Sequence, residues 1–406
     1  MATTLTTLSQ ESLRQGSFYV PAFQVLVQNS GLPHDVVRDI TQITYHDNYK
    51  EIDGFELTLN NWDATSRSFK YVGSETAKTL EKGPRSAYYK LFEPCGKTVQ
   101  ISMGYLNDLR VMMSGRFTTL EPNFPAGGAP TINVRGLNLL NALRSKQYTT
   151  VWAGKRDSEI AQNLDSLRDP DTGKKRVPAT IMIDKHSIEK EPKLDYVAEE
   201  NQYDIDFLLA RARQRGYVLV YNEGVKGAKP TLYFGPSQNA EAAGRAVTFQ
   251  LDWGKSLLDF KPTLVTHNQI KSVTVSGWNR RTKKPISAKA TLTDPAFRMN
   301  RDIQRLITEC NPRQQIVVHE PVFTPQEAQR RAEAILTDRL RSFVKATGTT
   351  VGLADLRAGV NVVIGGVGSR FSGTYFVTET THTIGANGYT TRFSARREDF
   401  DGGSAS

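Results

Sequence analysis

Residues 359–397 carry the pattern that most constrains how this chain can fold. Apolar residues occupy positions 360, 362 and 364, and glycines at 365, 366 and 368 then interrupt the run. A second strand is expected from Tyr375, followed by a turn at 385–388, where Asn and Gly accept the positive φ of a tight hairpin. The return strand has one face of Tyr389, Thr391, Phe393 and Ala395 and another of Thr390, Arg392, Ser394 and Arg396. This pattern predicts three strands that close a β-barrel, with one buried face and one wet face.

The first third of the chain shows the same alternation of apolar and polar residues. Phe55, Leu57 and Leu59 share one face of a strand expected over residues 54–60. Further strands are expected over residues 18–29, 36–45, 99–103, 110–120 and 131–135, with a turn at 106–109. Short strands separated by turn signals are typical of a barrel or a sandwich.

The middle of the chain mixes helical and strand patterns. Helices are expected over residues 136–144 and 158–167, the second with Asp157 as its N-cap. A further helix should begin with Asp204 as its N-cap and stop at Gly216 in the C′ position. Strands at 217–221 and 231–234 then predict a hairpin, so this region has an α+β character.

The last third begins with a second β series around residues 269–278 and contains one longer helix. Thr324 and Glu327 have the spacing of a capping box, and Pro325 occupies the first helical position. One face of this helix is apolar and is expected to pack in a core, with Arg330 on the polar face; its members are Ala328, Ala332, Ile335, Leu336, Leu340 and Phe343. The chain thus runs from a β-meander through a mixed middle to a second β-meander, which allows two related barrels.

Several segments together resemble one protein family. They are residues 371–377 (FSGTYFV) with His382, the ending 388–397 (GYTTRFSARR), the middle segments at 215–217 (RGY) and 232–235 (LYFG), and residues 277–286 (GWNRRTKKPI). In these segments the chain is similar to the late control gene D family, the hub proteins of contractile phage tails and related contractile injection machines.

This resemblance implies a fold, an assembly and a set of partners. The fold would be mainly β, with two antiparallel, tube-like β-barrel domains, an α+β middle region and short helices. The domains would be residues 1–150 with an N-terminal arm, residues 151–262, and residues 263–406 with the helix 325–343 and a flexible tail. The protein would be a non-enzymatic baseplate hub. Its homotrimer would adapt a hexameric inner tube to a trimeric spike and would contact other baseplate proteins. It would be made in the bacterial cytoplasm and incorporated into a phage tail or contractile particle.

Composition sets limits on the alternatives. The 406 residues carry a net charge of +10, which invites a nucleic-acid interpretation. The basic clusters are short and scattered, at 174–176, 280–284, 330–331 and 396–397, without interleaved aromatic residues, so direct nucleic-acid binding is not expected. No apolar run is long enough for a transmembrane helix, and the polar N-terminus is expected to be a mobile arm. Two distant cysteines, Cys95 and Cys310, are typical of a protein made in a reducing cytosol.

No catalytic, cofactor or metal site is predicted. The six histidines (His34, His46, His186, His267, His319 and His382) lack metal-ligand spacing. Gly254, Lys255 and Ser256 mimic the end of a phosphate loop, but Phe249 stands where its first glycine belongs. The carboxylate pairs Asp169/Asp171 and Asp204/Asp206 lie in a loop and at a helix start. Two alternatives stay open: a tail-associated cell-wall hydrolase with distant acids, and a basic nucleic-acid-binding β-protein.

Overall fold

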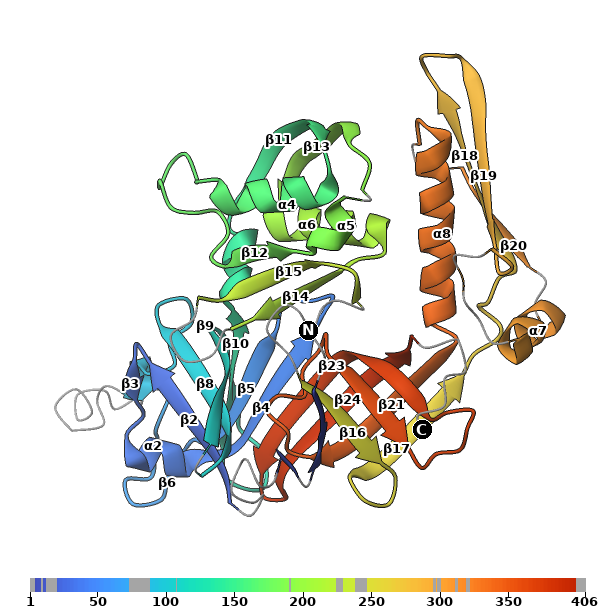
Figure 1. Cartoon of the computed structure of the whole chain (residues 1–406). Helices are drawn as coiled ribbons and strands as arrows, with labels where there is room; N and C mark the ends of the chain where they lie inside the picture. The colour runs from blue at the N-terminus through green and yellow to red at the C-terminus, as the bar shows by residue number, and fades with distance from the viewer. Residues whose placement is uncertain are drawn as a thin grey trace.

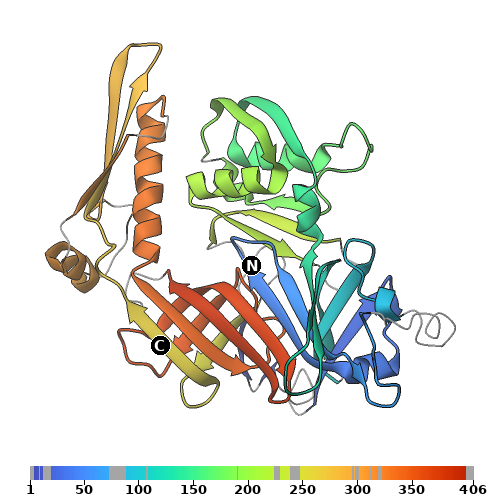
Figure 2. The ribbon, with the colours of Figure 1, turned by 180° about the vertical axis from the view of Figure 1, so that it is seen from behind.

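The computed structural model describes residues 4–8, 10–11, 20–72, 88–106, 108–189, 191–223, 229–237, 247–294, 297, 301–310, 313–318 and 322–398. Strands hold 50% of the residues and helices 20%, so the expected mainly β fold is confirmed. Two β units lie side by side at the base of the molecule (Figure 1). A middle module and a narrow arm rise from the same side of this base, which the view from behind also shows (Figure 2).

The N-terminal β unit is built from six main strands. They are β2 (Pro21–Val27), β4 (Ile40–Asn48), β5 (Gly54–Asn60), β8 (Thr98–Tyr105), β9 (Asp108–Asn123) and β10 (Thr131–Asn138). Their order across the sheet is β2-β8-β9-β10-β5-β4, and all neighbours are antiparallel. Smaller elements lie between them: β3 (Ser30–Gly31), α2 (His34–Asp39), β6 (Trp62–Asp63), β7 (Ser68–Phe69) and η1 (Tyr88–Lys90). Apolar residues alternate along each strand, so they lie on one face of the sheet. On that face they form a hydrophobic core that includes Ile43, Phe55, Leu57, Ile101 and Phe117.

The C-terminal β unit repeats this plan. Its strands are β16 (Val247–Asp252), β17 (Leu257–Leu264), β21 (Val344–Val351), β22 (Asn361–Gly365), β23 (Gly373–Gly385) and β24 (Gly388–Arg397), in the order β16-β22-β23-β24-β21-β17. In chain order, both units therefore place their strands as first, fourth, fifth, sixth, third and second. They differ in the first strand, since β16 runs parallel to β22 whereas β2 is antiparallel to β8. β23 pairs with β4 and joins the units into a single 14-stranded sheet.

The strand pairing among the described residues does not close into a ring in either unit, so the two barrels expected from the sequence stay a prediction. The predicted hairpin is confirmed: β23 and β24 pair around the turn at residues 385–388. Arg396, which was expected on the wet face of β24, is buried, because its guanidinium binds Glu398 and Tyr49. The N-terminal arm expected to be mobile contains β1 (Thr4–Thr7), which pairs in parallel with β16.

The middle module has a hydrophobic core of its own. Its elements are η2 (Leu139–Arg144), β11 (Gln147–Lys155), α4 (Asp157–Ser166), β12 (Thr180–Ile183), α5 (Lys185–Ile188), β13 (Leu194–Tyr203), α6 (Asp204–Arg215), β14 (Val218–Asn222) and β15 (Thr231–Gly235). Buried side chains from α4, α6 and the strands form this core. Gly216 ends α6 with φ of 71°, as predicted. Asp157 and Asp204 are the first helical residues rather than N-caps, because Arg156 and Tyr203 occupy the cap positions.

The arm is an insertion between β17 and β21. It contains β18 (Ser272–Asn279), β19 (Lys284–Thr291), α7 (Arg301–Cys310), β20 (Gln314–Val317) and α8 (Pro325–Arg341). The strand expected to open the second barrel, at 269–278, instead belongs to a separate three-stranded sheet, β19-β18-β20, since its apolar face packs on α8. β16 and β17, which begin before residue 263, pair with the strands of the C-terminal β unit.

Helix α8 confirms the predicted cap and buried face. The Thr324 side chain accepts a hydrogen bond from the Glu327 backbone N–H at 3.1 Å, and Ala328, Ala332, Leu336 and Leu340 are buried. Arg330 is half-buried rather than on an open polar face. Two further expectations were wrong in detail. Residues 36–39, expected to begin a strand, belong to the short helix α2. Of the helix expected at 136–144, residues 139–144 form the 3₁₀ helix η2 and residues 136–138 end strand β10.

Candidate assembly site: a polar wall with two open edges

Eight strands of the common sheet form one continuous antiparallel surface. Their order is β17-β21-β24-β23-β4-β5-β10-β9, with four strands from each β unit. The core clusters of both units lie behind this surface. Because side chains alternate across a strand, the opposite face is the wet one. We call this face the polar wall.

The polar wall is rich in small uncharged side chains. Adjacent strands place threonines, serines and asparagines in register, as in the pairs Thr347–Ser394 and Thr58–Asn133. Its charges are partly matched: Arg135 binds Glu56 at 3.1 Å and Glu121 at 3.3 Å. Exposed ion pairs of this kind add little stability. The chemistry of the wall therefore fits a hydrated surface rather than a binding pocket.

Both ends of the polar wall are open edges among the described residues. At one end, β17 pairs with β21 and no strand pairs with its other side. At the other end, residues 118–123 of β9 pair only with β10, because the pairing between β8 and β9 stops at Arg116 of β9. Exposed hydrophobic side chains stand at both ends, Leu258 on β17 and Phe124 just after β9. Open edges with apolar neighbours favour pairing with another chain.

A buried arginine holds the two β units together behind the wall. Arg357, in the segment between β21 and β22, donates from Nε to Asp47 Oδ2 of β4 at 2.6 Å and from Nη2 to the Met112 carbonyl of β9 at 3.0 Å. It also donates to the Tyr45 hydroxyl. Burial alone would lower the pKa of Arg357, but the contacts with Tyr45 and Asp47 outweigh it and raise that pKa. The guanidinium therefore stays charged and fixes how the two units meet.

His382 on β23 is a second buried polar group at this junction. Its Nε2 lies 3.0 Å from the Leu356 carbonyl, and its Nδ1 lies 3.0 Å from the Tyr389 hydroxyl and 3.1 Å from Thr391 Oγ1. These contacts fit a neutral ring whose Nε2–H donates and whose Nδ1 accepts. The histidine of the recognised motif is thus a satisfied core residue.

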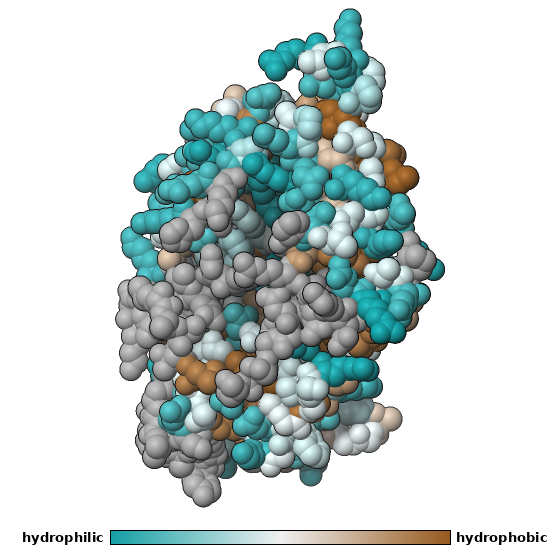
Figure 3. Space-filling view, turned by 45° about the vertical axis from the view of Figure 1, so that its right-hand side comes forward, coloured by the Kyte–Doolittle hydropathy of each residue, from teal (hydrophilic) through white to brown (hydrophobic). Residues whose placement is uncertain are grey.

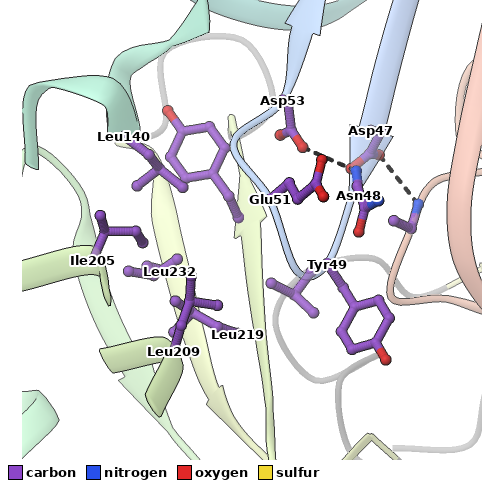
Figure 4. A pocket seen from close by; sticks show the side chains of 13 residues that line it. Asp47, Asn48, Tyr49, Glu51, Asp53, Leu140, Ile205, Leu209, Leu219 and Leu232 are labelled. Carbon is purple, nitrogen blue, oxygen red and sulfur yellow. Dashed lines mark hydrogen bonds between the residues drawn. The ribbon is translucent and has the colours of Figure 1, made fainter. Parts of the chain in front are cut away.

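A small cavity lies where the middle module meets the two β units. Figure 4 shows apolar side chains of the module facing Asp47, Glu51 and Asp53 of the N-terminal unit. Asp53 accepts from the Asn48 backbone N–H at 3.1 Å, and Asp47 accepts from the Ala358 N–H at 3.1 Å. The cavity measures about 20 Å³, which is room for about one water molecule and no organic ligand.

Glu398 joins the arm, the middle module and the wall. Its carboxylate accepts from Ser237 at 2.7 Å and from Arg396 at 2.8 Å, and it lies 3.4 Å from Arg341 Nε of α8. Beside this cluster the wall is hollowed into an open basin of about 640 Å³, in which Lys261, Lys345 and other cations are exposed. The cluster therefore links the C-terminal end of α8 to the end of β24.

The residues singled out for chemistry do not come together. Residues 254–256 form the turn between β16 and β17, followed by a strand and not by the helix of a phosphate loop. Asp169 accepts from the Tyr148 hydroxyl at 2.7 Å, which lowers the pKa of Asp169, and Asp206 pairs with Arg144 at 3.0 Å. Within the described ranges, no three His, Cys, Asp or Glu side chains gather as a metal site. His319 lies outside the described residues, and Cys95 and Cys310 are exposed free thiols.

One pair of buried carboxylates was missed by the sequence reasoning. Glu199 and Asp204 share Arg176, with Arg176 Nη2 at 3.3 Å from Glu199 and Arg176 Nε donating to Asp204 at 3.0 Å. Burial, together with Asp204, raises the pKa of Glu199 to about 7. Both acids are almost fully buried, so a polymer substrate has no access to them. Arg357 was also missed, because an arginine between apolar neighbours in a loop gives no periodic signal.

Solved structures show which class of protein shares this fold. A tail protein from Neisseria meningitidis MC58 is 14% identical, with 95% of this chain and 98% of that chain covered and a TM-score of 0.62. The 43 kDa tail protein of prophage MuSo2 from Shewanella oneidensis is 13% identical, with 92% and 98% covered and a TM-score of 0.62. The Escherichia coli c3393 protein, a type VI secretion component described as similar to bacteriophage T4 tail proteins gp27 and gp5, is 10% identical, with 93% and 77% covered and a TM-score of 0.53.

The chain therefore has the fold of phage tail and type VI secretion proteins. A family model described as the Alg8 N-terminal domain matches residues 85–386, and the chain belongs to that family. No curated protein sequence matches the chain. Of the helices that the structure describes, none has both the length and the apolar character needed to span a bilayer.

Proposed function

We propose that this protein is a non-enzymatic baseplate hub of a contractile tail or injection machine. Three copies would form a ring that adapts a hexameric inner tube to a trimeric spike, with other baseplate proteins around it. The observation that carries this proposal is the polar wall, whose two β units have the same strand order and whose two edges are open. The fold shared with tail proteins supports the same assignment.

The strand order supports a ring with six similar parts. Each β unit contributes four wall strands in the same order and the same directions, so the units follow one another head to tail. Head-to-tail contacts generate rings when the rotation closes, whereas a two-fold contact cannot. In such a ring the junction between copies would repeat the junction inside the chain, where β23 pairs with β4. Residues 118–123 of β9 correspond to β23, and β17 corresponds to β4.

The internal junction also specifies the register between copies. Inside the chain, Thr381 of β23 faces His46 of β4. Thr381 lies opposite Arg392 on β24, and Thr119 lies opposite Arg135 on β10, the strand that corresponds to β24. Thr119 is therefore the equivalent of Thr381. His46 corresponds to Lys261 in the matching strand β17. Thr119 of one copy should therefore face Lys261 of the next. The residue after Lys261 is Pro262, which has no backbone N–H to donate to the neighbouring strand.

A disulfide between copies tests this register. In a background with Cys95→Ser and Cys310→Ser, the pair Thr119→Cys with Lys261→Cys should give covalent dimers and trimers on oxidation. Facing Cα atoms of antiparallel strands lie about 4.5–5.5 Å apart, which is within the Cα separation that a disulfide spans. Thr119→Cys with Lys174→Cys, on the middle module, is the control and should stay monomeric on denaturing gels. Light scattering at low and high salt gives the native mass of the unmodified protein. A monomer at tens of micromolar would reject the ring, whereas a trimer without the cross-link would reject only the register.

No specific observation favours the alternative functions. A cell-wall hydrolase needs an accessible acid pair, whereas Glu199 and Asp204 are buried. Release of soluble muropeptides from peptidoglycan by the purified protein would nevertheless count against a purely structural role.

A further inference from the structure

The arm carries an exposed sheet face that the proposed ring does not use. α8 packs on one side of the β19-β18-β20 sheet and buries Val273, Val275 and Val317. On the other side, Ile316 and Val318 are each 69% exposed and Trp278 is 53% exposed. Ile316 and Trp278 share a face, because Ile316 pairs with Thr274, four residues before Trp278 on β18, while Val275 pairs with the buried Val317. Val318 directly follows β20. We call Ile316, Val318 and Trp278 the arm patch.

The patch adjoins an open strand edge. In the part of the chain that the structure describes, β20 pairs with β18 and with no other strand. An open edge offers a row of backbone donors and acceptors to an incoming strand, and exposed aliphatic side chains beside it then pack on that strand. This geometry selects an extended polypeptide as the partner.

The charge of the arm defines the partner further. Residues 271–291 contain six cations (Lys271, Arg280, Arg281, Lys283, Lys284 and Lys289) and no Asp or Glu. The turn between β18 and β19 is the outermost part of the arm (Figure 1). In the space-filling view the top of the molecule is hydrophilic, with hydrophobic residues just below it (Figure 3). A partner strand with acidic side chains would match this arrangement.

We propose that the arm patch and the free edge of β20 bind an acidic, extended segment of another protein by strand addition. Nucleic acid is less well matched, because the patch is mainly aliphatic and the Phe323 ring already has Arg280 over it at 5.5 Å. The arm rises above the base that carries the polar wall and its open edges (Figure 1).

Fluorescence anisotropy with the full chain tests the proposal. The probe is a labelled peptide of alternating valine and glutamate, compared with the same peptide N-methylated at alternate amides and with a valine–lysine peptide. The acidic peptide should bind, and methylation should weaken binding by about tenfold or more because one row of donors is removed. Arg281→Glu/Lys284→Glu should weaken it similarly, while the control Lys174→Glu/Lys175→Glu, with the same charge change, should not.

Several outcomes would overturn the proposal. Equal binding of the methylated peptide would exclude strand addition, and equal binding by the Arg281→Glu/Lys284→Glu variant would exclude the arm as the site. Tighter binding of single-stranded DNA or of anionic vesicles than of the acidic peptide, in the same buffer, would assign the patch to nucleic acid or to a membrane. No preference for the acidic over the basic peptide would reject the acidic partner.

Discussion

Replacing Arg357 with methionine should strongly destabilise the protein, although the two side chains have similar length. The substitution removes the cationic partner of Asp47, whose side chain is almost fully buried, and leaves the Met112 carbonyl without its 3.0 Å hydrogen bond. Removing one partner of a buried ion pair costs about 3–5 kcal/mol, because the remaining charge stays buried without its counter-charge. Domains are stable by only about 5–15 kcal/mol, so this loss is large.

A double-mutant cycle separates the charge effect from lost packing. In Asp47→Asn/Arg357→Met both charges are gone, so the double variant should lose less stability than the two single changes added together, by about 1–3 kcal/mol. The assay is urea unfolding followed by circular dichroism. Arg135→Met is the matched control, since that arginine is 48% exposed in its ion pair with Glu56, and it should cost about 1 kcal/mol or less. A cost for Arg357→Met no larger than for the control, or an additive cycle, would refute the reasoning.

Three more expectations concern particular side chains. Leu336→Ala, which opens the core under α8, should cost about 2–5 kcal/mol in urea unfolding, whereas Leu106→Ala, at a 67% exposed leucine, should change stability by about 0.5 kcal/mol or less. Gly348→Ala would place a Cβ 2.5 Å from the Phe393 ring and should lower stability by about 1–3 kcal/mol; an unchanged midpoint would show that the ring moves freely. The folded-state pKa of Glu199 is raised from 4.5 to about 7, so the native protein binds the carboxyl proton more tightly than the unfolded chain does. The free energy of unfolding therefore falls as pH rises from 4.5 to about 7. Glu199→Gln should therefore gain stability relative to the parent between those pH values, and parallel curves would contradict the assignment.

Local patterns in the sequence predicted local structure well. The alternation in residues 389–395 and the turn before it gave the β23–β24 hairpin, because both depend on neighbouring residues. The cap of α8 at Thr324 and the stop of α6 at Gly216 were found for the same reason. These local patterns do not predict which strand pairs with which. β18 alternates as the wall strands do, yet it pairs within the arm.

The missed features depend on contacts between distant parts of the chain. β17 was not predicted, because Pro262 interrupts its pattern, and proline is tolerated there since β17 is an edge strand. Arg357 reaches Asp47 across 310 residues of sequence. Such a pair becomes visible only when the two β units are already in place, so the site at their junction could not be derived from spacing.

The two β units share a strand order, although the residues at equivalent core positions can differ. In the N-terminal unit the ring of Phe55 on β5 covers Gly136 on β10, and in the C-terminal unit the ring of Phe393 on β24 covers Gly348 on β21. These are the same two strand positions with phenylalanine and glycine exchanged. A ring over a glycine fills the same space whichever strand supplies it, so packing constrains the sum of the two volumes and not the residue at each position. On the wet side no such exchange is needed, and a threonine faces an arginine in both units, as Thr119 with Arg135 and as Thr381 with Arg392. This threonine–arginine pair is the point at which the two units are aligned, and the register between copies is inferred from it.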